Sequence, residues 1–294
     1  MAERPTLAQV QAAGQARGLD RLDAQLLLLH VLGRAPTERG WLLTHDGEAL
    51  TPEQAEHWQT LAQRRIDGVP LAYLTGSKAF YGLDLQVSPD VLVPRPDTET
   101  LVDWALEVLH GQAARVLDLG TGSGAIALAL KASAPALDVW ATDRSAQALQ
   151  QARTNAQRLQ LEVQFCLGSW FDALPSDAPA FDLIVSNPPY IAVADPHLEA
   201  LRFEPEQALT SGADGLDDLR RIIQGARPHL VPGAWLLLEH GYDQAEAVQQ
   251  LLRAAGLEQV QSRADLAGHW RCTGARQPAH PAPGCITPTT SDLP

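Results

Sequence analysis

The residues best suited to chemistry are the consecutive Asn187, Pro188, Pro189 and Tyr190, which follow the apolar run 181–186. That run predicts a buried parallel strand, and open α/β sheets bind ligands at the carboxyl ends of their strands. The prolines stiffen the backbone, because proline fixes its own φ and holds the preceding residue extended. The side-chain oxygen of Asn187 and the backbone oxygen of Pro188 are then two fixed hydrogen-bond acceptors. They suit a planar NH2 group stacked on Tyr190, and so predict the catalytic and substrate-binding residues of an N-methyltransferase.

A glycine-rich loop follows a second apolar run, 115–119, and precedes a helical pattern. Its glycines let the backbone approach a bound ligand closely. Asp143, at the end of the next expected strand, is placed to hold ribose hydroxyls. Trp170 follows the third strand, where a flat adenine needs an aromatic or apolar wall. Within the loop itself, we expect the cofactor to contact Gly120, Thr121, Gly122, Ser123 and Gly124.

The glycine loop and Asp143 alone do not identify the cofactor, because they suit NAD as well as S-adenosyl-L-methionine. The segment 187–190 decides between them, since it has no role in hydride transfer and a direct use in methyl transfer to nitrogen. The cofactor is therefore predicted to be S-adenosyl-L-methionine, with Asn187 also contacting it. Structural roles compete with two of these assignments: Trp170 can pack in the core, and Asp143 can cap the helix expected after it.

The elements that hold these residues alternate between strand and helix from about residue 114, which predicts a mainly parallel α/β sheet with helices on both faces. Asp97 or Thr98 is expected to cap a helix that begins just after them. Glu239 and His240 are interpreted as strand-end packing rather than as a catalytic base. The expected strands are 115–119, 139–143, 163–167, 182–186 and 234–239, and two weaker C-terminal strands complete a seven-stranded, Rossmann-like sheet. The expected helices are 125–134, 145–159, 217–229 and 244–255.

The chain is expected to divide into four parts. Residues 1–75 carry apolar stripes at helical spacing and predict a small bundle of four helices. Residues 76–95 alternate around a glycine turn, which is typical of a β-hairpin, and would link the two domains. Residues 96–276 form the predicted methyltransferase domain. Residues 277–294 are rich in proline and almost uncharged, and are predicted to be a disordered tail.

The composition narrows the possible classes. The chain has 294 residues, 45% of them hydrophobic, as is usual for globular proteins. A formal net charge of −13 and the lack of a basic run disfavour direct nucleic-acid binding. No apolar stretch is long enough for a membrane helix and no signal peptide is recognisable, so a cytoplasmic location is expected. The three cysteines are Cys166, Cys272 and Cys285. They form no CxxC pair and no even set, which argues against a disulfide framework and against a zinc site.

Beyond these patterns, the sequence closely resembles the release factor glutamine methyltransferases over about residues 5–276. A related group methylates a glutamine of a ribosomal protein and shares the Asn-Pro-Pro-Tyr segment. The residues after Pro94 and Arg95 favour the release factor branch. The motifs that carry the resemblance are Arg64-Arg65 with Gly68-x-Pro70-x-x-Tyr73-x-x-Gly76, residues 92–99, 118–124 and 187–190, Glu204-Pro205-x-x-Ala208-Leu209, and Leu238-Glu239-His240-Gly241.

The resemblance implies a specific reaction, the methylation of the side-chain amide nitrogen (N5) of the glutamine in the Gly-Gly-Gln motif of class 1 peptide chain release factors. It also implies that the helical N-terminal part helps to hold the release factor. Two alternatives within the same chemistry are a ribosomal-protein glutamine and an exocyclic amino group of DNA or rRNA, which would be a flipped base. A noncatalytic adaptor is a third alternative, which the glycine loop, Asp143 and Asn187 together argue against.

Overall fold

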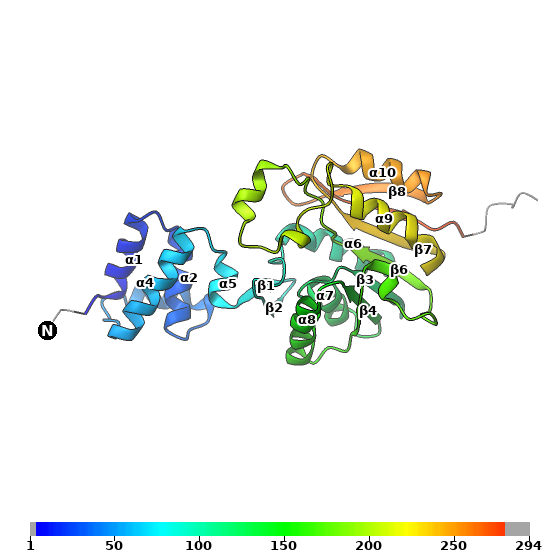
Figure 1. Cartoon of the computed structure of the whole chain (residues 1–294). Helices are drawn as coiled ribbons and strands as arrows, with labels where there is room; N and C mark the ends of the chain where they lie inside the picture. The colour runs from blue at the N-terminus through cyan, green and yellow to red at the C-terminus, as the bar shows by residue number, and fades with distance from the viewer. Residues whose placement is uncertain (1–3, 280–294) are drawn as a thin grey trace, which may run out of the picture.

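The computed structural model describes residues 4–279. A helical unit lies at the N-terminal end, a two-stranded hairpin follows it, and a large sheet flanked by helices forms the rest of the molecule (Figure 1). The segment predicted to be a disordered tail, 277–294, lies outside the described residues from position 280 onward. Among the described residues, no helix is both long enough and apolar enough to cross a membrane.

The helical unit forms because capped amphipathic segments bury their apolar sides together. Thr6 and Thr51 each start a helix with a capping box, in which a glutamine three residues later bonds back to the cap backbone. Trp58 and Leu27 lie at the centre of the resulting core. The prediction of four helices missed a short fifth one. The helices are α1 (Leu7–Ala16), α2 (Arg21–Val31), α3 (Arg39–Thr44), α4 (Pro52–Ile66) and the additional α5 (Leu71–Thr75).

The predicted hairpin is present as β1 (Ser77–Phe80) and β2 (Leu83–Gln86), which pair antiparallel. Asn155, in α8 (Ala146–Leu159), fixes it to the larger domain. Its side chain accepts the Gln86 N–H at 2.8 Å and donates to the Gln86 carbonyl at 2.9 Å. The hairpin is therefore bonded directly to the part of the chain that forms the large sheet.

The sheet has seven strands in the order β5-β4-β3-β6-β7-β9-β8, with β3 to β7 parallel and the last two antiparallel. Each predicted strand is confirmed to within one residue except β7, which starts four residues earlier and accommodates Pro232 and Gly233 through a register shift against β6. The strands are β3 (Arg115–Leu119), β4 (Asp138–Asp143), β5 (Gln164–Leu167), β6 (Phe181–Ser186), β7 (Leu230–Glu239), β8 (Glu258–Ala264) and β9 (Trp270–Arg276).

Helices cover both faces of this sheet, as predicted. One apolar core lies between the sheet and α6 (Glu99–Leu109), α7 (Ala125–Ser133) and α8. The opposite core packs under α9 (Asp217–Ala226) and α10 (Ala245–Ala254). The strand order reverses at β3, which lies between β4 and β6, so the loops after these three strands open into one crevice. The glycine loop, Asp143 and Asn187 lie at the ends of these three strands, and Trp170 follows the neighbouring β5.

Candidate active site

A cavity of about 660 Å³ opens at the carboxyl ends of β3, β4 and β6. Five of the predicted cofactor residues line it together: Gly120, Gly122, Asp143, Trp170 and Asn187. The rest of the wall consists of residues that were not predicted to contact the cofactor: Asp90, Val91, Leu92, Arg144, Ser145, Ala148, Gly168, Ser169, Pro189, Pro205, Gln207 and Ala208.

Asp143 joins the glycine loop to the start of α8. Its two carboxylate oxygens accept the N–H of Gly122 at 2.9 Å and of Ser145 at 2.8 Å. Burial raises the pKa of this carboxyl, while the two backbone N–H groups act in the opposite direction. The α8 cap itself is the Ser145 hydroxyl, which accepts the N–H of Ala148 at 3.1 Å. Each Asp143 oxygen keeps a further lone pair for a ligand hydroxyl.

Trp170 and Gly120 pack against each other across the cavity wall. Gly120 has a φ of +73°, and a Cβ added there would lie 3.1 Å from the Trp170 ring. Trp170 also packs against the core beneath α9, so the same side chain belongs both to the cavity wall and to the core. A residue without a side chain is thus required both by the backbone conformation and by the ring.

Three residues predicted to contact the cofactor, Thr121, Ser123 and Gly124, do not line the cavity. The Thr121 hydroxyl turns inward and donates to Asp118 at 2.6 Å, and the Ser123 carbonyl accepts a side-chain N–H of Asn155 at 2.9 Å. Gly124 precedes the first turn of α7, with a φ of +86°. Asp118 itself is fully buried, and burial raises its pKa to about 7. The contacts with Asp118 and Asn155 therefore support the glycine loop on the side away from the cavity.

A second cavity, of about 860 Å³, lies on the other side of the Asn187 segment. Leu92, Asn187 and Ala208 line both cavities. Pro188 and Tyr190 face the second, whereas Pro189 faces the first. The rest of the second wall combines the helical unit with later loops: Arg65, Gly68, Pro70, Arg95, Ile191, Ala200, Leu201, Glu204 and Leu209. A molecule entering this cavity would therefore contact both parts of the protein beside Asn187.

Hydrogen bonds behind the site hold Asn187 and Tyr190. The Asn187 Nδ2 donates to the Thr98 hydroxyl at 3.2 Å, and the Tyr190 hydroxyl donates to Glu239 at 3.3 Å. The prediction that Asp97 or Thr98 caps α6 is wrong. No side chain caps this helix, because Thr98 bonds to Asn187 and Asp97 forms an ion pair with Arg271 at 3.2 Å. Both side chains thus bond to residues far along the chain and not to the start of the helix.

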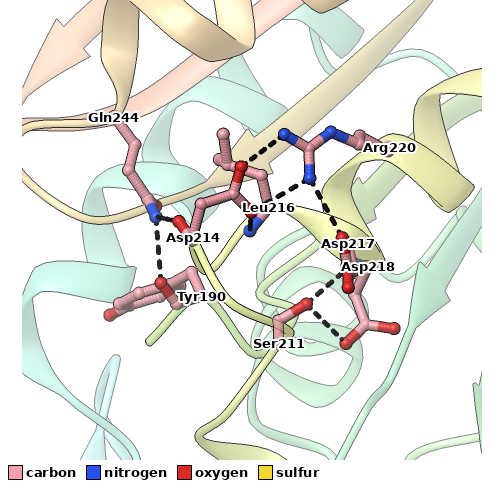
Figure 2. A network of polar contacts seen from close by, with 8 residues as sticks. All are labelled: Tyr190, Ser211, Asp214, Leu216, Asp217, Asp218, Arg220 and Gln244. Carbon is pink, nitrogen blue, oxygen red and sulfur yellow. Dashed lines mark hydrogen bonds and ion pairs between the residues drawn. The ribbon is translucent and has the colours of Figure 1, made fainter. Parts of the chain in front are cut away.

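The backbone of Tyr190 is held by a clamp that sequence reasoning missed (Figure 2). The Gln244 side chain donates to the Tyr190 carbonyl at 3.0 Å and accepts the Gly241 N–H at 2.8 Å. Gly215 lies against the same carbonyl, since a Cβ added there would come within 2.2 Å of the oxygen. Figure 2 shows how Arg220 ties this loop down through Asp214, at 2.5 Å, and Asp217, at 3.0 Å. No local pattern signals these contacts.

The loop 204–209, which forms part of both cavity walls, is fixed at two points. Buried Glu204 pairs with Arg95 and accepts the Val93 N–H at 3.1 Å. Arg144 reaches from the end of β4 and donates to the Gln207 carbonyl at 2.6 Å. The motif Glu204-Pro205-x-x-Ala208-Leu209 was the available sequence signal for this loop, although it did not reveal what the loop contacts.

The hydrogen-bond acceptors and the surfaces of the first cavity fit S-adenosyl-L-methionine. Asp143 offers carboxylate lone pairs for ribose hydroxyls, Trp170 a flat apolar face, and Gly120 and Gly122 a backbone free of side chains. Residues 4–279 contain no group of three or more His, Cys, Asp or Glu side chains arranged to hold a metal ion.

Comparisons with known proteins agree with this geometry. The family model "Methyltransferase small domain" matches residues 98–212, and that of the "PrmC N-terminal domain" matches residues 6–76. A methyltransferase of Pyrococcus furiosus has the same fold, with a TM-score of 0.54 and 21% identity over 68% of this chain and 92% of its own. The fold and the site define a class I methyltransferase that uses S-adenosyl-L-methionine.

The particular family follows from sequence relatives. A release factor glutamine methyltransferase of Bordetella pertussis is 54% identical over 87% of this chain and 95% of its own length. One of Xylella fastidiosa is 50% identical over 90% of this chain and 96% of its own. The chain therefore belongs to the family of release factor glutamine methyltransferases.

Proposed function

We propose that this enzyme transfers the methyl group of S-adenosyl-L-methionine to the side-chain amide nitrogen (N5) of the glutamine in the Gly-Gly-Gln motif of class 1 peptide chain release factors. One observation carries the proposal: Asn187 lines both cavities, with Pro189 facing the first and Pro188 and Tyr190 facing the second. The first cavity suits the cofactor. The second therefore suits the amide that receives the methyl group.

The chemistry requires precise presentation of the amide. Its nitrogen is a poor nucleophile, because the lone pair is delocalised into the carbonyl. When bound, the cofactor supplies an electrophilic methyl carbon on a positively charged sulfur. The Asn187 Oδ1 and the Pro188 carbonyl each accept one amide N–H and aim the nitrogen towards the first cavity. Orientation of this kind can contribute up to ~7–11 kcal/mol to lowering a barrier.

The same residues stabilise the charge that develops. Acceptors on both N–H bonds increase the electron density on nitrogen as it attacks. The Tyr190 ring stacks on the planar amide and excludes water from one face. No strong base is needed in this scheme, because the methylated nitrogen is acidic and loses its proton readily. Asn187, Pro188 and Tyr190 are the residues proposed to act on the substrate, with Pro189 completing the stiff backbone.

The proposed partner is a protein rather than a nucleic acid. Arg65, Gly68 and Pro70 of the helical unit line the second cavity with the sheet domain, so a release factor would contact both. The formal net charge of −13 disfavours a polyanionic substrate. We expect the enzyme to act in the cytoplasm, where translation takes place.

The test is mass spectrometry after incubation with the cofactor and, separately, with a class 1 release factor, ribosomal proteins, rRNA and DNA. We expect a single methyl group on the Gly-Gly-Gln glutamine of the release factor. Asn187→Ala should lower the rate by about 10²-fold or more, which is typical for removing one well-placed polar group at a reacting centre. Gln112→Ala, an exposed amide at the opposite edge of the sheet, is the matched control. A methyl group found only on another substrate would overturn the proposal.

A further inference from the structure

Thr98 connects the start of α6 to the Asn187 segment, 89 residues further along the chain. Its side chain is buried, at 3% exposed, and its hydroxyl makes no bond to the helix it precedes. Instead the oxygen lies 3.2 Å from the Asn187 Nδ2. Thr98 lines neither cavity. It can therefore influence a ligand only through the residues that it contacts, of which Asn187 lines both cavities.

Glu239 lies behind both Thr98 and Tyr190, at the end of β7. Its side chain is buried, at 1% exposed, and Oε1 accepts the Tyr190 hydroxyl at 3.3 Å. Within residues 4–279, its other oxygen, Oε2, has no hydrogen-bond partner that meets ordinary geometry. The Thr98 side chain lies beside the same carboxyl and lowers its pKa, against the larger effect of burial, which raises it to about 7. The Glu239 carboxyl thus contacts Tyr190 directly and reaches Asn187 through Thr98.

The direction of these hydrogen bonds decides which end of the Asn187 amide faces the substrate. A threonine hydroxyl has one proton to donate and lone pairs to accept. Above about pH 7 the Glu239 carboxyl is ionised and only accepts, so the neighbouring Thr98 hydroxyl can turn its proton towards it while the Thr98 oxygen accepts the Asn187 Nδ2. Asn187 must then point its Nδ2 at Thr98, which leaves Oδ1 on the side of the cavities. The reverse orientation would set an NH2 group against the NH2 group of the substrate.

We infer that Thr98 and Glu239 are positioning residues for methyl transfer, which set the orientation of the Asn187 amide and of the Tyr190 ring by the polarity of their hydrogen bonds. The inference rests on the proposed function, since it assumes that Asn187 Oδ1 accepts an N–H of the substrate amide. Steric contacts alone cannot set the orientation of the Asn187 amide, because the two ends of an asparagine amide are nearly the same size. The prolines cannot set it either, because they fix the backbone and leave the side-chain amide free to turn.

The first test compares Thr98→Val with Thr98→Ser. Valine keeps the shape of threonine and removes the hydroxyl, whereas serine keeps the hydroxyl. We expect Thr98→Val to lower kcat by on the order of 10- to 100-fold, as for a misplaced catalytic group. The KM for the release factor and the affinity for S-adenosyl-L-methionine should change less than threefold. Thr98→Ser should restore most of kcat.

A matched control is Thr142→Val. Thr142 is fully buried in β4, and its hydroxyl has no hydrogen-bond partner among the described residues, so the same substitution removes no such contact. It should keep the wild-type kcat. Glu239→Gln is the second variant, and it serves if Thr98→Val does not fold. Glutamine keeps the size of the side chain but can donate to Thr98, which reverses the chain of hydrogen bonds. It should lower kcat selectively, as Thr98→Val does.

The outcomes separate this inference from the proposed function. If the wild-type enzyme does not methylate the release factor, the proposed function fails. If it does, and the folded variants keep kcat within threefold, the positioning role is wrong. The role is also wrong if kcat, cofactor affinity and melting temperature fall together, because that pattern marks a general loss of structure. A selective loss of kcat with rescue by serine supports it.

Discussion

Replacing Gly215 with alanine tests whether the position of the Tyr190 backbone controls catalysis. Gly215 has a φ of +75°, and its added Cβ would lie 2.2 Å from the Tyr190 oxygen and 2.8 Å from the Gln244 Nε2. Real Cβ contacts essentially never fall below 3.0 Å, so the carbonyl or the loop must move by about 0.8 Å. The Gln244 bond to the same oxygen, 3.0 Å long, would be strained or broken.

The effect can be estimated from two sources. Left-handed backbone at a residue with a Cβ and overpacking of a tight contact together destabilise the fold by roughly 2–5 kcal/mol. A displacement near 1 Å in a group that positions a reactant can lower the rate by about 10²-fold. We therefore expect Gly215→Ala to remain folded with a lower melting temperature, to bind S-adenosyl-L-methionine, and to lose about 10²-fold in kcat.

The assay is single-turnover transfer of labelled methyl to a release factor, with cofactor saturating. Gly111→Ala is the matched control, because Gly111 also has a positive φ, of +69°, but has no atom within 4 Å of an added Cβ. Gly111 precedes β3, so it lies at the amino end of this strand, whereas the cavities lie at the carboxyl ends. This control should lose stability by about 1 kcal/mol and keep its rate. If Gly215→Ala turns over within threefold of the control, the clamp does not position the site.

Two further predictions concern the cofactor cavity and the buried carboxyls. Gly120→Ala should weaken S-adenosyl-L-methionine binding by roughly tenfold, equivalent to 1.4 kcal/mol, because the added Cβ displaces either the loop or Trp170; an unchanged Kd in calorimetry would contradict this. Asp118 and Glu239 each have a pKa raised by burial to about 7, so between about pH 4 and 7 they are protonated in the folded and ionised in the unfolded protein. The free energy of unfolding should therefore fall as pH rises through that range and level off above it, by up to ~1.4 kcal/mol per pH unit for each group. In denaturant titrations at pH 5 and pH 7.5, Glu239→Gln should flatten this dependence, and an unaltered slope would show that Glu239 does not carry it.

The sheet could be predicted closely because its strands are buried on both faces and read as continuous apolar runs. The run before Asn187 is an example, since five of the six residues in β6 are buried. The start of β7 was misplaced, because Pro232 and Gly233 suggest a turn, and only the pairing with β6 shows that the strand continues through them. The short helix α5 was missed because five residues are too few to display a helical period.

The site could be predicted in part for a similar reason. Residues that follow strands must gather at the carboxyl edge, so Gly120, Asp143 and Asn187 could be placed together from order alone. Thr98 was assigned to a helix cap because local pattern carries no information about a partner 89 residues away. Glu239 was interpreted as packing for the same reason, although the structure sets its carboxyl against Tyr190. Contacts between distant segments are the part that sequence patterns did not reach.

Three separate features fix the Asn187 segment, and each restricts a different degree of freedom. The two prolines restrict the backbone torsions and hold the Pro188 carbonyl. The Gln244 and Gly215 contacts fix where that stiff segment lies relative to the sheet. Thr98 fixes the rotation of the Asn187 amide, which neither of the others can reach. Because the last two act from outside the cavity walls, changes there should alter the rate of methyl transfer more than the binding of either ligand, whereas changes at Gly120 or Trp170 should do the opposite.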